Sequence, residues 1–503
     1  MDSTRSGILY LSETYSKIFK DREKFKEIIT ATKVSGDEQG ITFNSADDAE
    51  FNFYQNTVNL ENDLISPIAD AAFSFYRYKL LGTFYTQEGH LINQIELKRK
   101  IDSSPTFEGT IYIVEDDWSF YGLDLKVNRS QSSLTALDEF RIKQNYIHDL
   151  GSNSWVKSDQ VIEFKIGIFG FNFNAHFSGV YTQYDFNPIF ENKTFGKMIY
   201  YIEDEANQKD SLFVQNRPIP LTSKEFSNYK EKDSIVKAHT TPAYRDSLDR
   251  EINRFQWSDF LGKTIQNSKK EVKYGFSIPT SAFHFNTVQG YNAKINLFYN
   301  RKWEKQKKSL RINAYNVYGF SDQKNYPGIQ LDYLMDKVHY SKWLLRAERS
   351  LVQFDGESPI GLLMNSIYSL LLKENYAKWY ENSKIEAHFS TFLSPEFWVT
   401  IAAAHFQRNP RQNTTDVAYF NKDRIYQSNT PINAEYDFQP HTLNKIDFVL
   451  QYKPENQFYQ YPNQRFYTQK ENYPILSLGF TRAFGSSISQ YNFMKMDFPR
   501  FSF

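Results

Sequence analysis

The chain has 503 residues, enough for two or three domains, and its 59 Lys and Arg residues balance its 59 Asp and Glu residues. This neutrality gives no overall attraction for nucleic acid, and the absence of cysteine excludes disulfides, thiolate metal sites and cysteine nucleophiles. A mean hydropathy of −0.60, with no apolar run near ~20 residues, excludes a bundle of membrane-spanning helices but not a membrane barrel, in which only alternate residues face lipid.

Residues 1–70 form an N-terminal mixed segment, in which apolar residues follow no clean period. The first residues have neither a basic region nor an apolar run, so they do not form a signal peptide. Either the protein stays in the cytoplasm or the chain is a fragment that has lost its leader, and we expect the fragment.

Residues 71–185 are predicted to form an antiparallel β domain, because runs of alternating apolar residues are separated by short turns. A single curved sheet of this kind needs a helix, a lipid or a partner over its concave face. The predicted strands lie at 91–97, 107–114, 119–127, 137–146, 155–169 and 171–184.

Residues 186–270 break the strand pattern and are rich in charges of both signs. Thr222 and Glu225 have the spacing of a capping box, which predicts a helix over 223–233. Pro242 is expected to open a second helix over 243–255. We interpret this region as a charged helical linker.

Residues 271–503 are predicted to form an antiparallel barrel, beginning with the stretch 291–299. That stretch has the length of a membrane-crossing strand and an aromatic residue at each end of its apolar face. The alternative is a half-buried strand of a soluble sandwich. The predicted lipid-facing residues are Tyr291, Ala293, Ile295, Leu297 and Tyr299, and the predicted lumen-facing residues are Asn292, Lys294 and Asn296.

The same alternation recurs at 310–314, 384–389, 397–403, 445–452 and 476–481, which favours the membrane barrel over the sandwich. Residues 359–382 do not fit, because their apolar residues recur with helical spacing. We expect a short helix or a folded-in loop there.

The sequence contains no nucleotide-binding, metalloprotease or serine-hydrolase motif, and we assign no catalytic, cofactor-binding or metal-binding residue. Three weaker candidates remain. His388 and His405 lie on neighbouring predicted strands, Ser390 shares a strand face with His388, and residues 115–117 carry three carboxylates that could bind calcium or form a turn.

Several short stretches resemble a Bacteroidota outer-membrane β-barrel family of unknown function, whose longer members usually carry an N-terminal carboxypeptidase-regulatory-like domain. They lie at 6–13, 33–36, 51–54, 65–68, 109–114, 246–249, 285–290 and 373–380. The leader and the regulatory-like domain of the family are absent upstream of Met1. Family members also tend to continue beyond residue 503, so two outcomes are expected: a complete barrel or a barrel that lacks strands. At fold level, residues 71–185 also resemble the half-barrel of periplasmic lipoprotein carriers.

The resemblance implies location and architecture rather than chemistry. We expect a mainly β protein with a periplasmic, half-barrel-like sheet domain followed by a transmembrane antiparallel β-barrel in the bacterial outer membrane. It would be non-enzymatic and would act in envelope biogenesis or in transport of a lipid, glycan or protein. Its partners would be outer-membrane lipids, the barrel-assembly machinery and a periplasmic or outer-membrane protein. The alternatives are a soluble or surface-attached β-sandwich that binds glycans, and an envelope hydrolase using His388 and Ser390.

Overall fold

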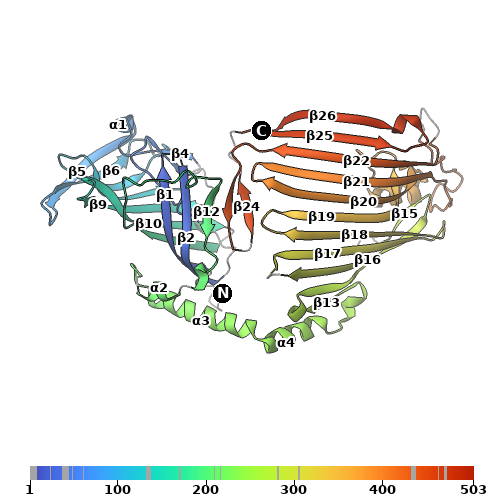
Figure 1. Cartoon of the computed structure of the whole chain (residues 1–503), viewed down its shortest axis with the longest axis horizontal. Helices are drawn as coiled ribbons and strands as arrows, with labels where there is room; N and C mark the ends of the chain where they lie inside the picture. Colours follow the sequence, from blue (N-terminus) through green and yellow to red (C-terminus); the bar gives the residue numbers. More distant parts are fainter. Residues whose placement is uncertain are drawn as a thin grey trace. The chain divides into compact units, whose positions relative to one another are not determined.

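The computed structural model describes residues 8–502 except 9, 23, 37–44, 48, 61, 132–136, 169–170, 209, 216, 280–282, 304–305, 432–437, 463 and 469–472 (Figure 1). The protein is mainly β, with 54% of its residues in strands and 13% in helices, and its two large sheets are antiparallel as predicted. The chain folds as two compact units. The first contains Met1–Glu27, Thr32–Phe195 and Gln208–Thr222, and the second contains Ile28–Ala31, Gly196–Asn207 and Ser223–Phe503.

The first unit is built on a seven-stranded meander in which each strand pairs with the next along the chain. The strands predicted between residues 91 and 184 are confirmed, with small shifts at their ends. The strands are β5 (Tyr76–Tyr85), β6 (Leu91–Arg99), β7 (Glu108–Val114), β8 (Phe120–Asn128), β9 (Leu137–Asp149), β10 (Ser154–Ile168) and β11 (Phe171–Val180).

The chain itself supplies the cover for one face of this sheet. Residues 49–72 carry β3 (Thr57–Leu60) and β4 (Asn62–Ile65) and lead into α1 (Ala72–Phe75). Phe53 is fully buried and lies edge-to-face with Phe107, with ring centroids 5.2 Å apart. The buried amide groups of Gln144 and Gln160 donate to the Phe51 and Ala49 carbonyls, at 2.7 and 2.6 Å. The helix, lipid or partner expected at this face is therefore replaced by an irregular segment of the chain.

Residues 1–70 received no element prediction, yet they contain two long neighbouring strands, β1 (Tyr10–Asp21) and β2 (Lys24–Gly36). The first unit also holds the short helix α2 (Asp210–Gln215). In the second unit, β12 (Met198–Ile202) pairs in parallel with β23 (Gln457–Gln460), which pairs with β24 (Arg465–Thr468).

The two predicted helices are confirmed as α3 (Ser223–Thr240) and α4 (Pro242–Asn253). α3 continues seven residues beyond the predicted end at residue 233. Thr241 caps α4, because its hydroxyl accepts from the Tyr244 amide at 3.3 Å, and Pro242 occupies the first turn, where a missing N–H costs nothing.

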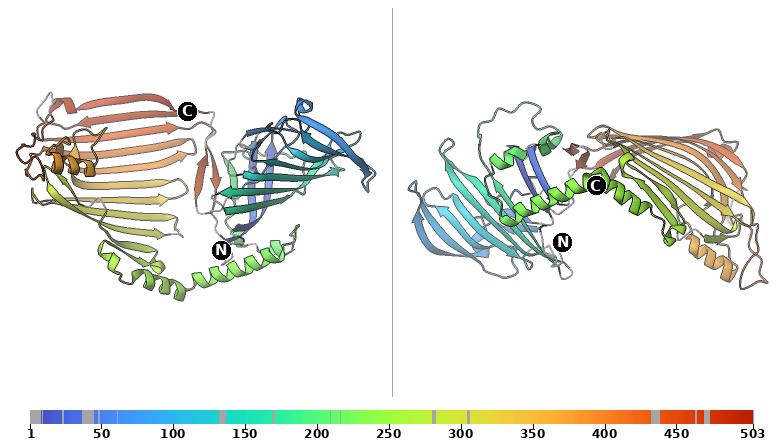
Figure 2. Two further views of the ribbon diagram at one scale, coloured as in Figure 1. Left: turned by 180° about the vertical axis from the view of Figure 1, so that it is seen from behind. Right: turned by 90° about the horizontal axis from the view of Figure 1, so that it is seen from below.

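The second unit is dominated by a twelve-stranded sheet, which Figure 2 shows to be curved. Pairing runs from β13 at one edge to β26 at the other, and β15 also pairs with β16. No closed barrel is detected in the described part of the chain. The strands are β13 (Gly262–Asn267), β14 (Val272–Ser277), β15 (Phe283–Asn286), β16 (Gly290–Trp303), β17 (Lys308–Gly319), β18 (Lys324–Asp336), β19 (Ser341–Gln353), β20 (Trp379–Ser394), β21 (Phe397–Pro410), β22 (His441–Tyr452), β25 (Ile475–Phe484) and β26 (Phe493–Ser502).

The helical prediction for residues 359–382 is right for its first half only. α5 (Leu362–Ile367) continues into a π-helical turn, Tyr368–Leu372, and Lys373 ends it in the left-handed conformation, with φ 57°. From Trp379 the chain is strand β20, fully paired with β19. Helical spacing of Tyr376 and Trp379 is outweighed there by tertiary pairing. None of the helices that the structure describes is long and apolar enough to cross a membrane.

Candidate functional site

The twelve-stranded sheet has two faces of opposite character. Strand pairing fixes which residues share a face, because directly paired residues point to the same side. One row of directly paired residues crosses nine neighbouring strands without a polar side chain, apart from two tyrosine hydroxyls. The row is Ile265, Tyr274, Tyr299, Ile312, Leu331, Leu345, Ala387, Ala403 and Ile446. We call the face that carries it the apolar face.

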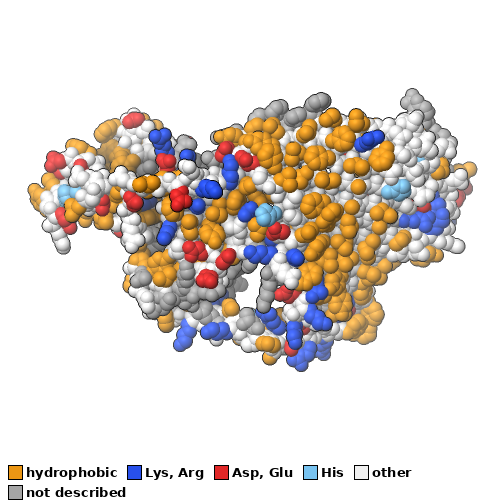
Figure 3. Space-filling model, in the orientation of Figure 1, with side chains coloured by type: hydrophobic (Ala, Val, Ile, Leu, Met, Phe, Trp, Pro, Cys, Tyr) orange, Lys and Arg blue, Asp and Glu red, His pale blue; other side chains and the backbone are white. Residues whose placement is uncertain are grey.

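Large side chains on the apolar face are exposed. Ile385 is 66% exposed and Leu297 is 51% exposed, although both lie in the middle of long strands. Figure 3 shows hydrophobic side chains spread over this sheet from β16 to β26. Further exposed members are Ile295, Ile329, Ile401, Leu478, Met494 and Met496.

The predicted site residues lie on β16 in the alternation that the sequence indicated. Tyr291, Ala293, Ile295, Leu297 and Tyr299 belong to the apolar face; the first, third and fourth are exposed and the other two are half-buried. Asn292, Lys294 and Asn296 point to the opposite face. Lys294 and Asn296 are half-buried, whereas Asn292 is almost completely buried.

Aromatic residues gather on the apolar face at one end of the strands. Tyr333, Trp343 and Phe389 are paired directly on β18, β19 and β20, and the last two rings lie 4.9 Å apart. On the next strands, Phe397 pairs with Tyr452, and their rings stack at 4.9 Å. These five residues lie at the end where the strands are joined by the short connections 304–307, 337–340 and 395–396 and by the longer connection 453–474.

The opposite face, which we call the polar face, carries charged side chains in a connected network. Glu386 accepts from Arg346 at 2.8 Å and from Lys384 at 3.3 Å, and Lys384 also contacts Glu348 at 3.2 Å. The Tyr315 hydroxyl donates to Glu348 at 2.9 Å. These two cations and two carboxylates pair with one another, so this network adds polarity to the face without adding net charge.

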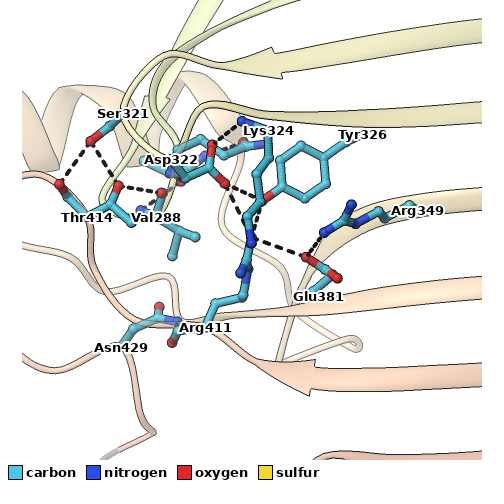
Figure 4. A network of polar contacts seen from close by, with 12 residues as sticks. Val288, Ser321, Asp322, Lys324, Tyr326, Arg349, Glu381, Arg411, Thr414 and Asn429 are labelled. Atoms are coloured by element: carbon cyan, nitrogen blue, oxygen red, sulfur yellow. Dashed lines mark hydrogen bonds and ion pairs between the residues drawn. The ribbon is translucent and has the colours of Figure 1, made fainter.

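Polar contacts tie together the long connections at the other end of the strands (Figure 4). Arg411, which follows β21, contacts Glu381 at 3.2 Å, Asp322 at 3.5 Å and the Tyr326 hydroxyl at 3.0 Å. Arg349 reaches the same Glu381 carboxylate at 3.0 Å. Two guanidinium groups thus hold one nearly buried carboxylate and fix the start of the 411–440 connection against the turn 320–323.

Three further contacts extend this network to the turn before β16. The Thr414 hydroxyl donates to the Val288 carbonyl at 2.7 Å, and the Thr414 amide donates to the Thr287 carbonyl at 2.9 Å. The Ser321 hydroxyl donates to the Thr414 carbonyl at 2.9 Å. The connections at this end are therefore folded onto one another.

The weaker chemical candidates are not brought together. His405 is paired with Ile385 on the apolar face, whereas His388 is paired with Ala402 on the polar face, so the two rings lie on opposite sides of the sheet. Ser390 shares the polar face with His388, but its hydroxyl bonds to Thr400 at 3.0 Å. His388 and Ser390 therefore do not form the hydrogen-bonded Ser–His pair that nucleophilic catalysis needs.

The 115–117 carboxylates lie at a turn and are engaged by protein groups. Glu115 accepts from the Asn93 amide, and Asp117 accepts from the Trp155 indole at 2.8 Å. Within the described ranges, no group of three metal-ligating residues is found.

Sequence reasoning missed Arg411, Glu381 and Asp322. They come from three connections or strand ends that are far apart in the chain, and no local spacing joins them. The recurrence of strands did predict the apolar face, because a period of two is a local property.

A model of the family of unknown function DUF5686 matches residues 1–184, and a model of the C-terminal domain of that family matches residues 258–499. A search of curated proteins found no match to the chain.

Proposed function

Since the chain belongs to the family of unknown function DUF5686, whose description carries no activity, we propose a function from the geometry of the sheet: a non-enzymatic β-barrel of the bacterial outer membrane. It would act in envelope biogenesis or in transport of a lipid, glycan or protein, with its N-terminal unit in the periplasm. The observation that carries the proposal is the apolar face of the twelve-stranded sheet.

The extent of this face supports contact with lipid rather than water. Soluble monomers rarely expose apolar patches larger than a few hundred Å² without a partner. The uninterrupted apolar row crosses nine strands, and large side chains such as Ile385 and Leu297 are exposed on the same face. In a bilayer the same side chains would be in their preferred solvent, and the backbone groups between them are already paired within the sheet.

The height of the face also suits a membrane. From Tyr291 to Tyr299, β16 covers about 27 Å at a rise of about 3.4 Å per residue. A membrane-crossing strand tilted by about 45° needs about 9–11 residues, with aromatic residues at both interfaces of the apolar band. The Trp343, Phe389, Phe397 and Tyr452 rings would form the girdle at the end with the short connections.

The two ends of the strands suggest an orientation. Outer-membrane barrels have short turns on the periplasmic side and longer loops outside the cell. The connections 354–378 and 411–440 would then lie at the outer end of the strands, joined by the Lys373–Asp416 ion pair and by the hydrogen bond from the Asn375 side-chain amide to the Gln427 carbonyl. The polar face, with its paired charges, would line the interior and could accompany a polar or amphipathic cargo.

Membrane fractionation of cells that express the full chain tests this proposal. We expect recovery in the outer-membrane fraction, resistance to extraction by alkaline carbonate, and faster migration on a gel before boiling in SDS than after it. Recovery as a soluble monomer without detergent would contradict the proposal and would favour the glycan-binding β-sandwich.

A further inference from the structure

α5 lies against the free edge of strand β15 and satisfies its backbone. The Phe285 amide donates to the Ser366 hydroxyl at 2.9 Å, and the Asn365 side-chain amide donates to the Phe285 carbonyl at 3.0 Å. The neighbouring edge strand does not reach this point, because β13 pairs only with Val272–Ser277 of β14. The helix thus takes the position that a further strand would have beside β15.

The polar side of this helical segment is buried against the rest of the protein. Asn365, Ser366 and Ser369 are buried, and the Ser369 carbonyl accepts from the Tyr426 hydroxyl at 2.7 Å. The opposite side is apolar and exposed: Leu363 is 75% exposed, and Met364, Ile367, Leu371 and Leu372 are exposed as well. Residues 358–372 contain no charged residue, although 23% of the whole chain is charged.

This exposed side is continuous with the apolar face of the sheet. The Tyr419 amide donates to the Leu370 carbonyl at 2.7 Å, which joins the 411–440 connection to the helix. The Tyr419 hydroxyl is hydrogen-bonded to the hydroxyl of Tyr291, the first residue of the apolar face on β16. Val417, Tyr419 and Phe420 are exposed beside it.

We propose that α5, with residues 417–420, is immersed in lipid and completes the lipid-facing wall beside β15. This inference rests on the membrane location proposed above and adds a helical element to the wall. An unpaired strand edge is not tolerated in hydrocarbon, and the side chains of Asn365 and Ser366 remove that problem at Phe285. The polar side chains of α5 all contact the protein, and α5 carries no charged group whose hydration would keep it out of the membrane.

Lipid is favoured over a protein partner by the absence of charge from residues 358–372 and by continuity with the apolar face. Recognition surfaces of protein partners usually carry a polar rim. On the described α5 segment, the first charged neighbour is Lys373, whose ammonium group is buried and pairs with Asp416 at 2.8 Å. It therefore offers no free charge to a partner.

Lipid quenching of single-cysteine labels tests the proposal, and the native chain has no cysteine to interfere. The full chain would be folded into phosphatidylcholine vesicles that contain acyl chains with nitroxide groups. A bimane label would be placed by Leu363→Cys or Ile367→Cys. Ile385→Cys serves as the reference on the apolar face, and Asn313→Cys, which is exposed on the polar face, serves as the control.

We expect loss of fluorescence at residues 363 and 367 comparable to that at 385, and little loss at 313. Quenching at 385 without quenching at 363 and 367 would overturn the inference about α5 and leave the proposed function standing. Absence of quenching at 385 would defeat both. Bimane at 363 and 367 that stays bright in vesicles, combined with protection of the unlabelled cysteines at these positions from a water-soluble maleimide in native membranes, would assign the surface to a protein partner instead.

Discussion

Ile295 is the position at which the two environments of the sheet are most sharply separated. Its side chain is exposed on the apolar face, while Lys294 beside it points to the polar face and lies over the Tyr315 ring, 4.7 Å from its centroid. Neighbouring residues along the strand therefore face opposite environments.

Ile295→Arg should place a charge on the lipid side and reduce stability by roughly 2–4 kcal/mol near the bilayer midplane. Lys294→Gln is the matched control, because it removes a charge from the polar face and should cost little beyond a cation–π contact of about 1 kcal/mol or less. The measurement is the urea midpoint of refolding in vesicles. Equal stability of the Arg and Gln variants would mean that the faces are wrongly assigned.

In the first unit, Asp124 gives a pH-dependent prediction. Its carboxylate accepts two hydrogen bonds from Arg141, both at 2.7 Å. Burial alone would raise the pKa of Asp124, but the hydrogen bonds and charge of Arg141, with Lys143 nearby, hold that pKa below its ordinary value. A lowered folded-state pKa stabilises the fold above the ordinary pKa, near 4, and this contribution disappears as the pH falls below it.

Asp124→Asn should therefore speed hydrogen exchange in β8 and β9 at pH 7 and make little difference near pH 2. The comparison uses the full chain at both pH values. A difference that grows as the pH falls would contradict the assigned direction of the pKa.

Single positions also show which structural properties can be predicted from local sequence. The alternation at 291–299 predicted a strand, which is found as β16, because side-chain direction in a strand is set by the residue's own place; contact of its two faces with lipid and lumen stays a prediction. The burial of Asn292 could not be predicted in this way. It depends on what lies against the end of the sheet, and that is decided by distant connections.

At the scale of elements, the cover of the first unit's sheet is the clearest case of a tertiary effect. The strands of the meander are visible in the sequence, because each has its own period. The segment 49–72 has no continuous period, since its Phe51 and Phe53 side chains enter the core from irregular backbone.

Phe53→Ala tests that this segment is a structural part of the unit. Removing a fully buried aromatic ring should cost about 3–5 kcal/mol. Leu150→Ala, at a position that is 87% exposed, should stay within about 0.5 kcal/mol of the native chain. Thermal unfolding of the full chain, followed by hydrogen exchange in β5–β11, separates the two. Similar effects of both variants would argue against the packing described here.

The boundary between α5 and β20 shows why helical spacing misled the prediction. An apolar period near 3.6 is present through Trp379, but from that residue β19 offers a complete set of backbone partners. Pairing with a neighbouring strand fixed the conformation, which no property of residues 373–382 alone reveals.

At the scale of the whole second unit, an apolar face and a polar face lie on opposite sides of one curved sheet. The sequence predicted recurrent strands and their alternation. It could not predict the order of pairing at the edges, the helix beside β15 or the Arg411 network, because each depends on contacts between distant residues.

The most direct test of the central claim is lipid contact measured at alternating positions on two strands. Single cysteines at Ile312, Ala314, Ile401 and Ala403 probe the apolar face, and cysteines at Asn313 and Ala404 probe the polar face. In vesicles with nitroxide-labelled acyl chains, we predict strong quenching at the first four positions and weak quenching at the other two. Quenching that does not alternate, or that is strongest at 313 and 404, would contradict the account.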